Sequence, residues 1–310
     1  RAEVLEPVSV SGLRPVFGAA LAPGVEAPVI NQSRRTVKAT VRLAVPGWQT
    51  DPSALTLELK PGASRQARFG VASPALESGR RYQVKVQAET ADGSRSETAA
   101  DLNFLPCLRT KAKTKVDGDL GEWTGVPKAV VGGEWRPLNP TAYKGAADCS
   151  AQFMTAWDDE FLYVAVQVQD DVFLQTHDGT AVWSQDNLQL GLDPAPDAAG
   201  DFNPLVGFFG KRTYEYGLTL TPKGPQVWRW LSGDPENRPG ESLASEVRLA
   251  AVKTTNGVTY EAAFPWASVG VQKPAAGQQL GLALAVNDDD GEGRKAILWF
   301  DGIVHSKDPR

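Results

Sequence analysis

The chain has 310 residues, of which 42% are apolar and 22% charged, and it contains 30 Gly and 22 Pro. This composition is typical of a folded globular protein and excludes a collagen-like or disordered chain. Nothing approaches the run of about 18 apolar residues that a membrane span needs, and with two His and one Met a histidine-rich metal site is excluded. At about 100 to 200 residues per domain, the length predicts two domains.

Charge is distributed unevenly along the chain. Residues 1–106 carry 13 Lys and Arg against 10 Asp and Glu, a net charge of +3, whereas residues 107–310 carry 19 against 27, a net charge of −8. An acidic domain without a basic stripe repels phosphate backbones. We therefore do not expect nucleic acid as a ligand.

The two cysteines, Cys107 and Cys149, both belong to the acidic part of the chain. They are compatible with one disulfide that ties the entrance of the second domain to an inner strand, or with two unpaired thiols, and we expect the disulfide. The chain begins at Arg1 without Met or a signal peptide. We interpret it as a piece of a longer exported bacterial protein that is secreted, periplasmic or on the cell surface.

Residues 1–106 contain short runs in which apolar residues recur at every second position. Residues 36–43, 55–59 and 82–86 show this period, and Pro-Gly or Asp-Gly pairs separate the runs. Such a pattern predicts a small antiparallel β-sandwich. The order of the runs resembles the immunoglobulin-like domains that flank catalytic or sugar-binding modules in bacterial glycan-acting proteins. Trp48 follows a Pro-Gly turn, and we expect its ring to cap the packing of this domain.

Residues 107–310 continue the period of two with longer runs, at residues 161–169, 187–193, 258–264 and 280–286. This predicts a second antiparallel sandwich, about twice the size of the first by residue count, so that the whole chain is all-β. One face of each sheet would form the core and the other would face water. Tyr, Gln, Asn and Glu side chains on that outer face would offer a surface for polar ligands.

An ordered set of short motifs marks this second domain. They are residues 117–123 (DGDLGEW), 156–166 (AWDDEFLYVAV), 168–171 (VQDD), 183–186 (WSQD), 260–266 (YEAAFPW) and 285–288 (AVND). In this order they resemble carbohydrate-binding module family 9 and the related sugar-binding fold of the dopamine-monooxygenase N-terminal type, over residues 108–310. The resemblance implies a jelly-roll or sandwich domain that binds glycans through stacked tryptophans and polar side chains, with calcium ions of structural type.

The resemblance also implies where a sugar would bind. Trp183 matches a stacking tryptophan of the family, and stacking on a sugar or packing on the edge of the sandwich are both open interpretations of its ring. Gln189 stands where better-studied members carry Glu, and Glu215 stands near where they carry Arg. The second stacking tryptophan would fall near Ser306, beside His305.

Tryptophans supply a further candidate surface. Trp228 and Trp230 lie two residues apart on an expected strand, so their rings share one face. The pair would either form a strip on which a polysaccharide stacks or cover a hydrophobic edge, and both interpretations are open. Four other tryptophans stand within or close to the motifs and are expected in the core: Trp123, Trp157, Trp266 and Trp299.

Acidic turns are candidates for a metal ion. Residues 287–293 (NDDDGEG) combine carboxylates with glycines, which suits the six to eight oxygen ligands of calcium. Trp299 stands at the twelfth position counted from Asp288, where an EF-hand needs Glu, so this is not an EF-hand. A calcium site of another type at Asp288 and Asp290 or near Asp117 and Asp119 is one interpretation of these turns, and plain solvated turns are the other.

Catalysis is not expected of this chain. No nucleophile motif accompanies either histidine, and the acids lie at turns rather than at strand ends that converge. Relatives of the sandwich hold a b-type haem between Met and His or Lys, and Met154 and His177 would be the ligands of that minor alternative.

The leading hypothesis is a non-catalytic accessory region of a larger exported glycan-acting protein, which binds an oligo- or polysaccharide. A structural or interaction module that packs on its parent's catalytic domain, with the sugar site lost, is the alternative.

Overall fold

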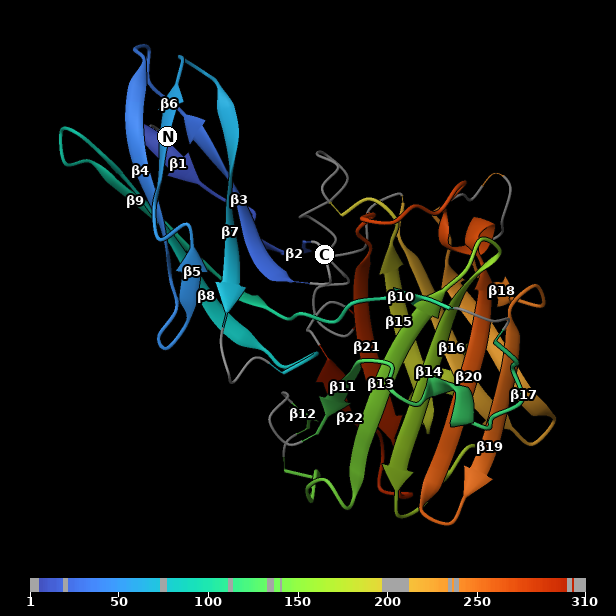
Figure 1. The fold of residues 1–310 in the computed structure, drawn as a ribbon. Coiled ribbons are helices and arrows are strands. Elements are labelled where there is room, and N and C mark those ends of the chain that lie inside the picture. The colour runs from blue at the N-terminus through green and yellow to red at the C-terminus, as the bar shows by residue number, and fades with distance from the viewer. Residues whose placement is uncertain are drawn as a thin grey trace, which may run out of the picture. The chain divides into compact units, whose positions relative to one another are not determined.

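The computed structural model describes residues 6–18, 22–72, 77–110, 114–132, 137–139, 141–196, 212–233, 236, 240–299 and 303. The chain divides into two compact units, Arg1–Pro106 and Cys107–Arg310. In both units the described elements are almost all strands, joined by turns and a few 3₁₀ helices (Figure 1). This confirms the all-β prediction. Among the described residues, no helix is long and apolar enough to cross a membrane.

The first unit is an immunoglobulin-like sandwich of two antiparallel sheets. One sheet has the order β1-β3-β7-β5, with β2 paired to β3, and the other has the order β6-β4-β8-β9. Their bounds are β1 (Val8–Val10), β2 (Arg14–Phe17), β3 (Pro23–Asn31), β4 (Val37–Ala44), β5 (Gln49–Asp51), β6 (Leu55–Leu59), β7 (Ser64–Ala72), β8 (Tyr82–Thr90) and β9 (Arg95–Leu102).

Alternate residues of these strands form a single core between the two sheets. The most deeply buried members come from both: Val25, Ala27, Val29, Ala39, Val41, Leu59, Phe69, Val84 and Val86. The half-buried ring of Trp48 closes one edge, with its centroid 5.1 Å from that of Tyr82 and 5.8 Å from that of Phe104. The expected packing role of Trp48 is confirmed.

The second unit is a larger sandwich. Its six-stranded sheet has the order β10-β13-β14-β20-β19, with β11 paired to β13, and its seven-stranded sheet has the order β12-β22-β21-β15-β16-β17-β18. The first contains β10 (Leu108–Arg109), β11 (Lys128–Val131), β13 (Cys149–Trp157), β14 (Phe161–Asp170), β19 (Arg248–Thr254) and β20 (Gly257–Pro265). The second contains β12 (Pro137–Leu138), β15 (Asn187–Asp193), β16 (Tyr214–Thr221), β17 (Gly224–Leu231), β18 (Ser242–Leu243), β21 (Gly281–Asp288) and β22 (Lys295–Trp299).

The inner faces of the two sheets carry the apolar residues that the period of two predicts. Leu188, Leu190 and Leu192 of β15 are each 1% exposed. The Tyr216 ring of β16 meets the Phe264 ring of β20 edge to face, at 5.1 Å between centroids. These contacts bury apolar surface from both sheets, which is the main stabilising contribution of a sandwich.

The outer face of the six-stranded sheet departs from the prediction that it faces water. The segment before β11, with the 3₁₀ helix η2 (Gly121–Trp123), lies over it. Trp123 packs there against Met154, Tyr163 and Ala263. Gln167 and Gln169, further along β14, are exposed as expected. Strand periodicity cannot show that a distant segment covers half of a sheet face.

Glu261 of β20 fixes this covering segment by accepting three hydrogen bonds. Its Oε1 accepts from Trp123 Nε1 at 2.8 Å, and its Oε2 accepts from the backbone N–H groups of Asp117 and Gly118, each at 3.0 Å. Glu261 is fully buried, and this burial raises the pKa of its carboxyl although the three donors act in the opposite direction. The carboxylate is thus the anchor of the motif at 117–123.

Replacing this anchor should destabilise the second unit. In Glu261→Ala three donors lose their acceptor, and we expect the free energy of unfolding to fall by about 1–3 kcal/mol. Urea denaturation followed by tryptophan fluorescence measures the change. Glu160→Ala, which removes an exposed carboxylate of the same unit, is the matched control, and equal stability of the two variants would contradict the anchoring role.

The expected disulfide between Cys107 and Cys149 is wrong, because both cysteines are free. Leu108 of β10 pairs in parallel with Ala156 of β13, which places Cys107 beside Thr155, its hydrogen-bond partner. Cys149 begins the same strand β13 six residues earlier, a separation of about 20 Å along a strand. A disulfide requires Cα atoms about 4.4–6.8 Å apart, so strand register keeps the two thiols apart.

Candidate functional site

The outer face of the seven-stranded sheet carries a row of polar side chains. Asn187 of β15 pairs with Asn287 of β21, and Gln189 of β15 pairs with Gly217 of β16. Glu215, two residues before Gly217, projects from the same face. All four polar side chains are buried, with 2–5% of their surface exposed. The prediction that these residues face water is therefore wrong, although the face to which they belong is the one predicted.

Gln189 is the centre of a hydrogen-bond network on this face. Its Nε2 donates to Glu215 Oε1 at 3.2 Å, and its Oε1 accepts from Asn287 Nδ2 at 2.9 Å. Asn287 Nδ2 also donates to Asn187 Oδ1. The Nδ2 of Asn187 has no hydrogen-bond partner within the described part of the chain. Because an unpaired buried donor costs free energy, this amide marks a place for an acceptor oxygen.

Arg294 completes the network, and the sequence analysis did not single it out. Its Nε donates to Asn287 Oδ1 and its Nη2 donates to Gln189 Oε1, both at 2.7 Å. Arg294 lies in the turn between β21 and β22. It directly follows residues 287–293, which the sequence analysis treated as a candidate metal-binding turn. The sequence offers one indication of this role: two basic residues, Arg294 and Lys295, directly follow the acidic run.

Trp183 lies beside this network on the 3₁₀ helix η3 (Gly179–Ser184). Its side chain is 45% exposed, and the Arg294 guanidinium carbon lies 5.3 Å from the centre of its ring. The exposed large apolar side chains among the described residues are Val130, Val172, Trp183, Leu243 and Val252. Trp183 is the one aromatic residue among them, and the expected site residues Trp183, Gln189 and Glu215 thus belong to one place.

Trp228 and Trp230 are half-buried and lie against η3. The Trp228 ring packs beside Gly179, and Trp230 Nε1 donates to the carbonyl oxygen of Thr180 at 3.0 Å. In addition, Gln226 accepts from the Gly179 N–H at 3.2 Å. Of the two interpretations left open, these contacts favour packing: the pair supports the helix that presents Trp183.

The Trp230 ring packs directly against the backbone of Gly217, so that only glycine fits at this position. A Cβ at this position would lie 2.3 Å from the Trp230 ring, far inside van der Waals contact. We therefore expect Gly217→Ala to displace the indole and lower the unfolding free energy by about 1–3 kcal/mol, the usual cost of overpacking. Thermal unfolding measures this. Gly132→Ala, where the nearest side-chain atom is 3.8 Å from the added carbon, should be neutral, and equal melting temperatures would contradict the requirement.

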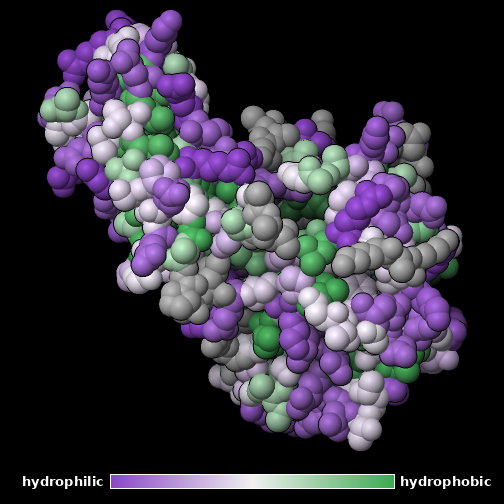
Figure 2. Space-filling model, in the orientation of Figure 1, coloured by the Kyte–Doolittle hydropathy of each residue, from purple (hydrophilic) through white to green (hydrophobic). Residues whose placement is uncertain are grey.

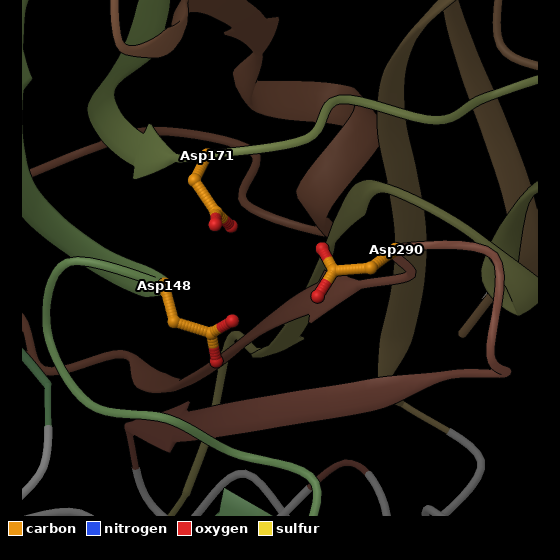
Figure 3. Close-up of side chains that lie close together, drawn as sticks. All are labelled: Asp148, Asp171 and Asp290. Carbon is orange, nitrogen blue, oxygen red and sulfur yellow. The ribbon is translucent and has the colours of Figure 1, made fainter.

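A second group of side chains, all acidic, gathers at the ends of the sheets. The carboxylates of Asp148, Asp171 and Asp290 point toward one another (Figure 3), and those of Asp170, Asp288 and Asp290 form an overlapping triplet. In each triplet one oxygen per residue lies within 4.8 Å of the others. Asp288 and Asp290, the candidate metal ligands, thus lie close to Asp148, which precedes β13, and to Asp170 and Asp171 at the end of β14.

Lys295 supplies a cation inside this acidic group. Its ammonium donates to Asp148 and, at 2.6 Å, to Asp290, and it lies 3.3 Å from Asp288 Oδ2. Within the described residues, neither Asp288 oxygen nor Asp290 Oδ1 receives a hydrogen bond, although Asp288 is 1% exposed. One ammonium therefore leaves buried carboxylate oxygens unsatisfied.

The pKa values of Asp288 and of the adjoining Asp186 are raised. Burial raises the pKa of Asp186 to about 9, and the neighbouring Asp170 carboxylate adds to the effect. Burial likewise raises the pKa of Asp288 to about 7, against the attraction of Lys295. Unsatisfied oxygens of this kind fit a hard cation such as calcium, which takes oxygen ligands.

The other expected site residues lie elsewhere. Asp117 and Asp119 belong to neither acidic triplet; their Oδ1 atoms each accept a backbone N–H two residues on, at 3.0 Å, as turn-forming carboxylates do. Met154 packs around Trp123 on the outer face of the six-stranded sheet, whereas His177 precedes η3, which packs against β17 of the other sheet, so the structure does not bring these two haem candidates together. His305 lies outside the described residues.

Trp123 and Trp266 are buried as expected, and Trp157 is half-buried with Arg109 over its ring at 4.9 Å. The side chain of Trp299 lies outside the described ones. Figure 2 shows hydrophilic residues over much of the visible surface of the second unit, with hydrophobic residues in small groups between them. No broad apolar face is visible there to compete with the polar site.

The described part of the second unit thus combines a β-sandwich, a polar sheet face and an adjoining exposed tryptophan, an aromatic surface on which a sugar ring can pack. The profile of the family described as "Carbohydrate family 9 binding domain-like" matches residues 134–309. Because this match covers more than half of the chain, the protein belongs to that family. A search of curated protein sequences finds no match.

Solved structures with a similar fold include two carbohydrate binding modules of family 9 from Caldicellulosiruptor kristjanssonii. The one in complex with cellotriose is 18% identical, with a TM-score of 0.44 over 64% of this chain and 85% of that chain. The one in complex with glucose is 17% identical, with a TM-score of 0.45 over 65% of this chain and 91% of that chain. A putative carbohydrate-binding protein from Bacteroides uniformis is 12% identical, with a TM-score of 0.41 over 62% and 87%.

Proposed function

We propose that the second unit binds an oligo- or polysaccharide at Trp183 and the Gln189 network. The observation that carries the proposal is the 45% exposed indole of Trp183 next to four connected polar side chains, three on the sheet and Arg294 in the adjoining turn. The C–H face of a pyranose packs on an indole, and its hydroxyls exchange hydrogen bonds with amide, carboxylate and guanidinium groups.

The binding role proposed here is non-catalytic and belongs to a longer, exported glycan-acting protein, in which the first unit is a spacer. Family membership supports carbohydrate binding for residues 134–309. The alternative from the sequence analysis is a structural module whose sugar site is lost. In such a module the candidate residues would be dispersed, or Trp183, Trp228 and Trp230 would all be buried. Trp183 is instead exposed beside a connected polar network, which favours the binding role.

Trp183→Ala should abolish the stacking platform. We expect the affinity for the best ligand of a glucan, xylan and mannan oligosaccharide panel to fall roughly tenfold or more, which corresponds to about 1.4 kcal/mol. Isothermal titration calorimetry measures the affinity. Val130→Ala, which shortens an exposed apolar side chain elsewhere in the unit, should leave it unchanged. Unaltered binding by Trp183→Ala would remove this residue from the site, and a folded protein that binds no glycan would refute the proposed function.

We further propose that the acidic group holds a structural calcium ion. The support is the orphaned Asp288 carboxylate, together with the convergence of Asp170 and Asp290 on the same space. Calcium would supply the positive charge that Lys295 alone does not provide, and would hold the ends of β14 and β21 together.

Calcium addition tests this proposal directly. At calcium concentrations about 100 times the dissociation constant, binding adds about 2.7 kcal/mol, and the melting temperature should rise by about 5–10 °C for a unit of this size. Asp288→Asn should lose most of this shift, whereas Asp117→Asn should retain it. Differential scanning calorimetry with and without a chelator makes the comparison, and the same shift in both variants would contradict the assignment.

A further inference from the structure

Arg294 is an accessible charged group beside the exposed indole of Trp183. It is half-buried, whereas Gln189 and Glu215 are buried. Its guanidinium uses one Nε and one Nη2 donor for the amide oxygens of Asn287 and Gln189. A guanidinium has five N–H donors, and no partner for the other three is found among the described residues. With respect to the described part of the chain, these donors can serve a ligand stacked on the indole.

Hydrogen bonds before Arg294 and ion pairs after it fix the turn that carries this residue. Asp289 Oδ1 accepts from the backbone N–H groups of Gly291 and Gly293, at 2.9 and 3.0 Å. Both glycines have positive φ, 92° and 101°, which other residues rarely adopt. After Arg294, the buried Lys295 ammonium is fixed among carboxylates. The guanidinium is therefore positioned before a ligand arrives, which lowers the entropy lost on binding.

The site also contains the counter-charge of Arg294. Glu215 is 3% exposed and accepts from Gln189 Nε2, whose carboxamide oxygen accepts from Arg294. Glu215 favours the charged form of the guanidinium, while burial, the larger effect, lowers the pKa of Arg294 to about 10. Arg294 therefore stays charged at neutral pH, and the Glu215 carboxyl is linked to it through the Gln189 carboxamide.

We propose that Arg294 contacts the ligand and that its compensation by Glu215 makes the site select neutral sugars over sugars that carry a carboxylate. A sugar hydroxyl accepts from the guanidinium without adding charge. A uronic acid would compete with Glu215 for the same cation and leave one carboxylate uncompensated in a buried site. This inference rests on the proposed sugar-binding function and adds the class of sugar.

The test titrates the full chain with neutral β-1,4-linked glucose oligosaccharides and with matched oligomers that contain glucuronic acid. Arg294→Gln should weaken neutral-sugar binding roughly tenfold or more, and Arg294→Lys should recover part of it. Glu215→Gln should shift the preference toward the acidic oligomers, because the guanidinium is then uncompensated. Arg248→Gln, which removes an exposed cation on the other sheet, should leave both affinities unchanged.

The two proposals fail in different ways. If the unchanged protein binds no sugar, the proposed function is refuted and this inference with it. If it binds neutral sugars but Arg294→Gln binds them equally well, or Glu215→Gln leaves the ratio of neutral to acidic affinity unaltered, only the role of Arg294 and Glu215 is overturned. Circular dichroism of each variant shows whether it is folded, and the change of preference is a readout that lost folding would not produce.

Discussion

The Lys295 ammonium, surrounded by carboxylates, is the interaction on which the candidate site depends. The ammonium forms ion pairs with Asp148, which immediately precedes β13, and with Asp288 and Asp290. Asp288 is the last residue of β21, and Asp290 lies in the turn that follows. A buried charge is tolerated only where partners compensate it, so this residue fixes the turn between β21 and β22. Arg294 is its immediate neighbour in that turn. The acidic group and the proposed sugar site are therefore connected through β21, which carries both Asn287 and Asp288.

Period-two patterning was sufficient to predict both sandwiches and the inner residues of their strands. It assigned Gln189 and Glu215 to the outer sheet face, where they do lie. It could not predict that these side chains are buried in a hydrogen-bond network, because the network also includes Asn287 and Arg294 from a distant part of the chain. The covered half of the six-stranded sheet was misjudged because a strand pattern does not show a distant covering segment: Glu261 looks like an exposed strand residue until the motif at 117–123 is seen to fold onto it.

Long-range register and turn geometry account for what the sequence could not reveal. The cysteine pair was plausible by count, and only the parallel pairing of β10 with β13 separates the thiols. Arg294 escaped notice because its direction depends on two glycines with positive φ and on the bonds of Asp289. The tryptophans show the same limit. Identical residue types serve as core, as support for η3 and as an exposed platform, and contacts rather than composition distinguish these roles.

The shortness of strand β10 has a consequence for local opening. It follows directly after the boundary at Pro106 and forms a ladder of two residue pairs with β13, reinforced by the Thr110 N–H bond to Trp157 and by the Arg109–Asp159 ion pair. Neighbouring β13 and β14 share nine pairs. Fewer hydrogen bonds hold β10 than hold β14, so local opening of the second unit begins at this edge of the sheet while the pairing of β13 with β14 persists.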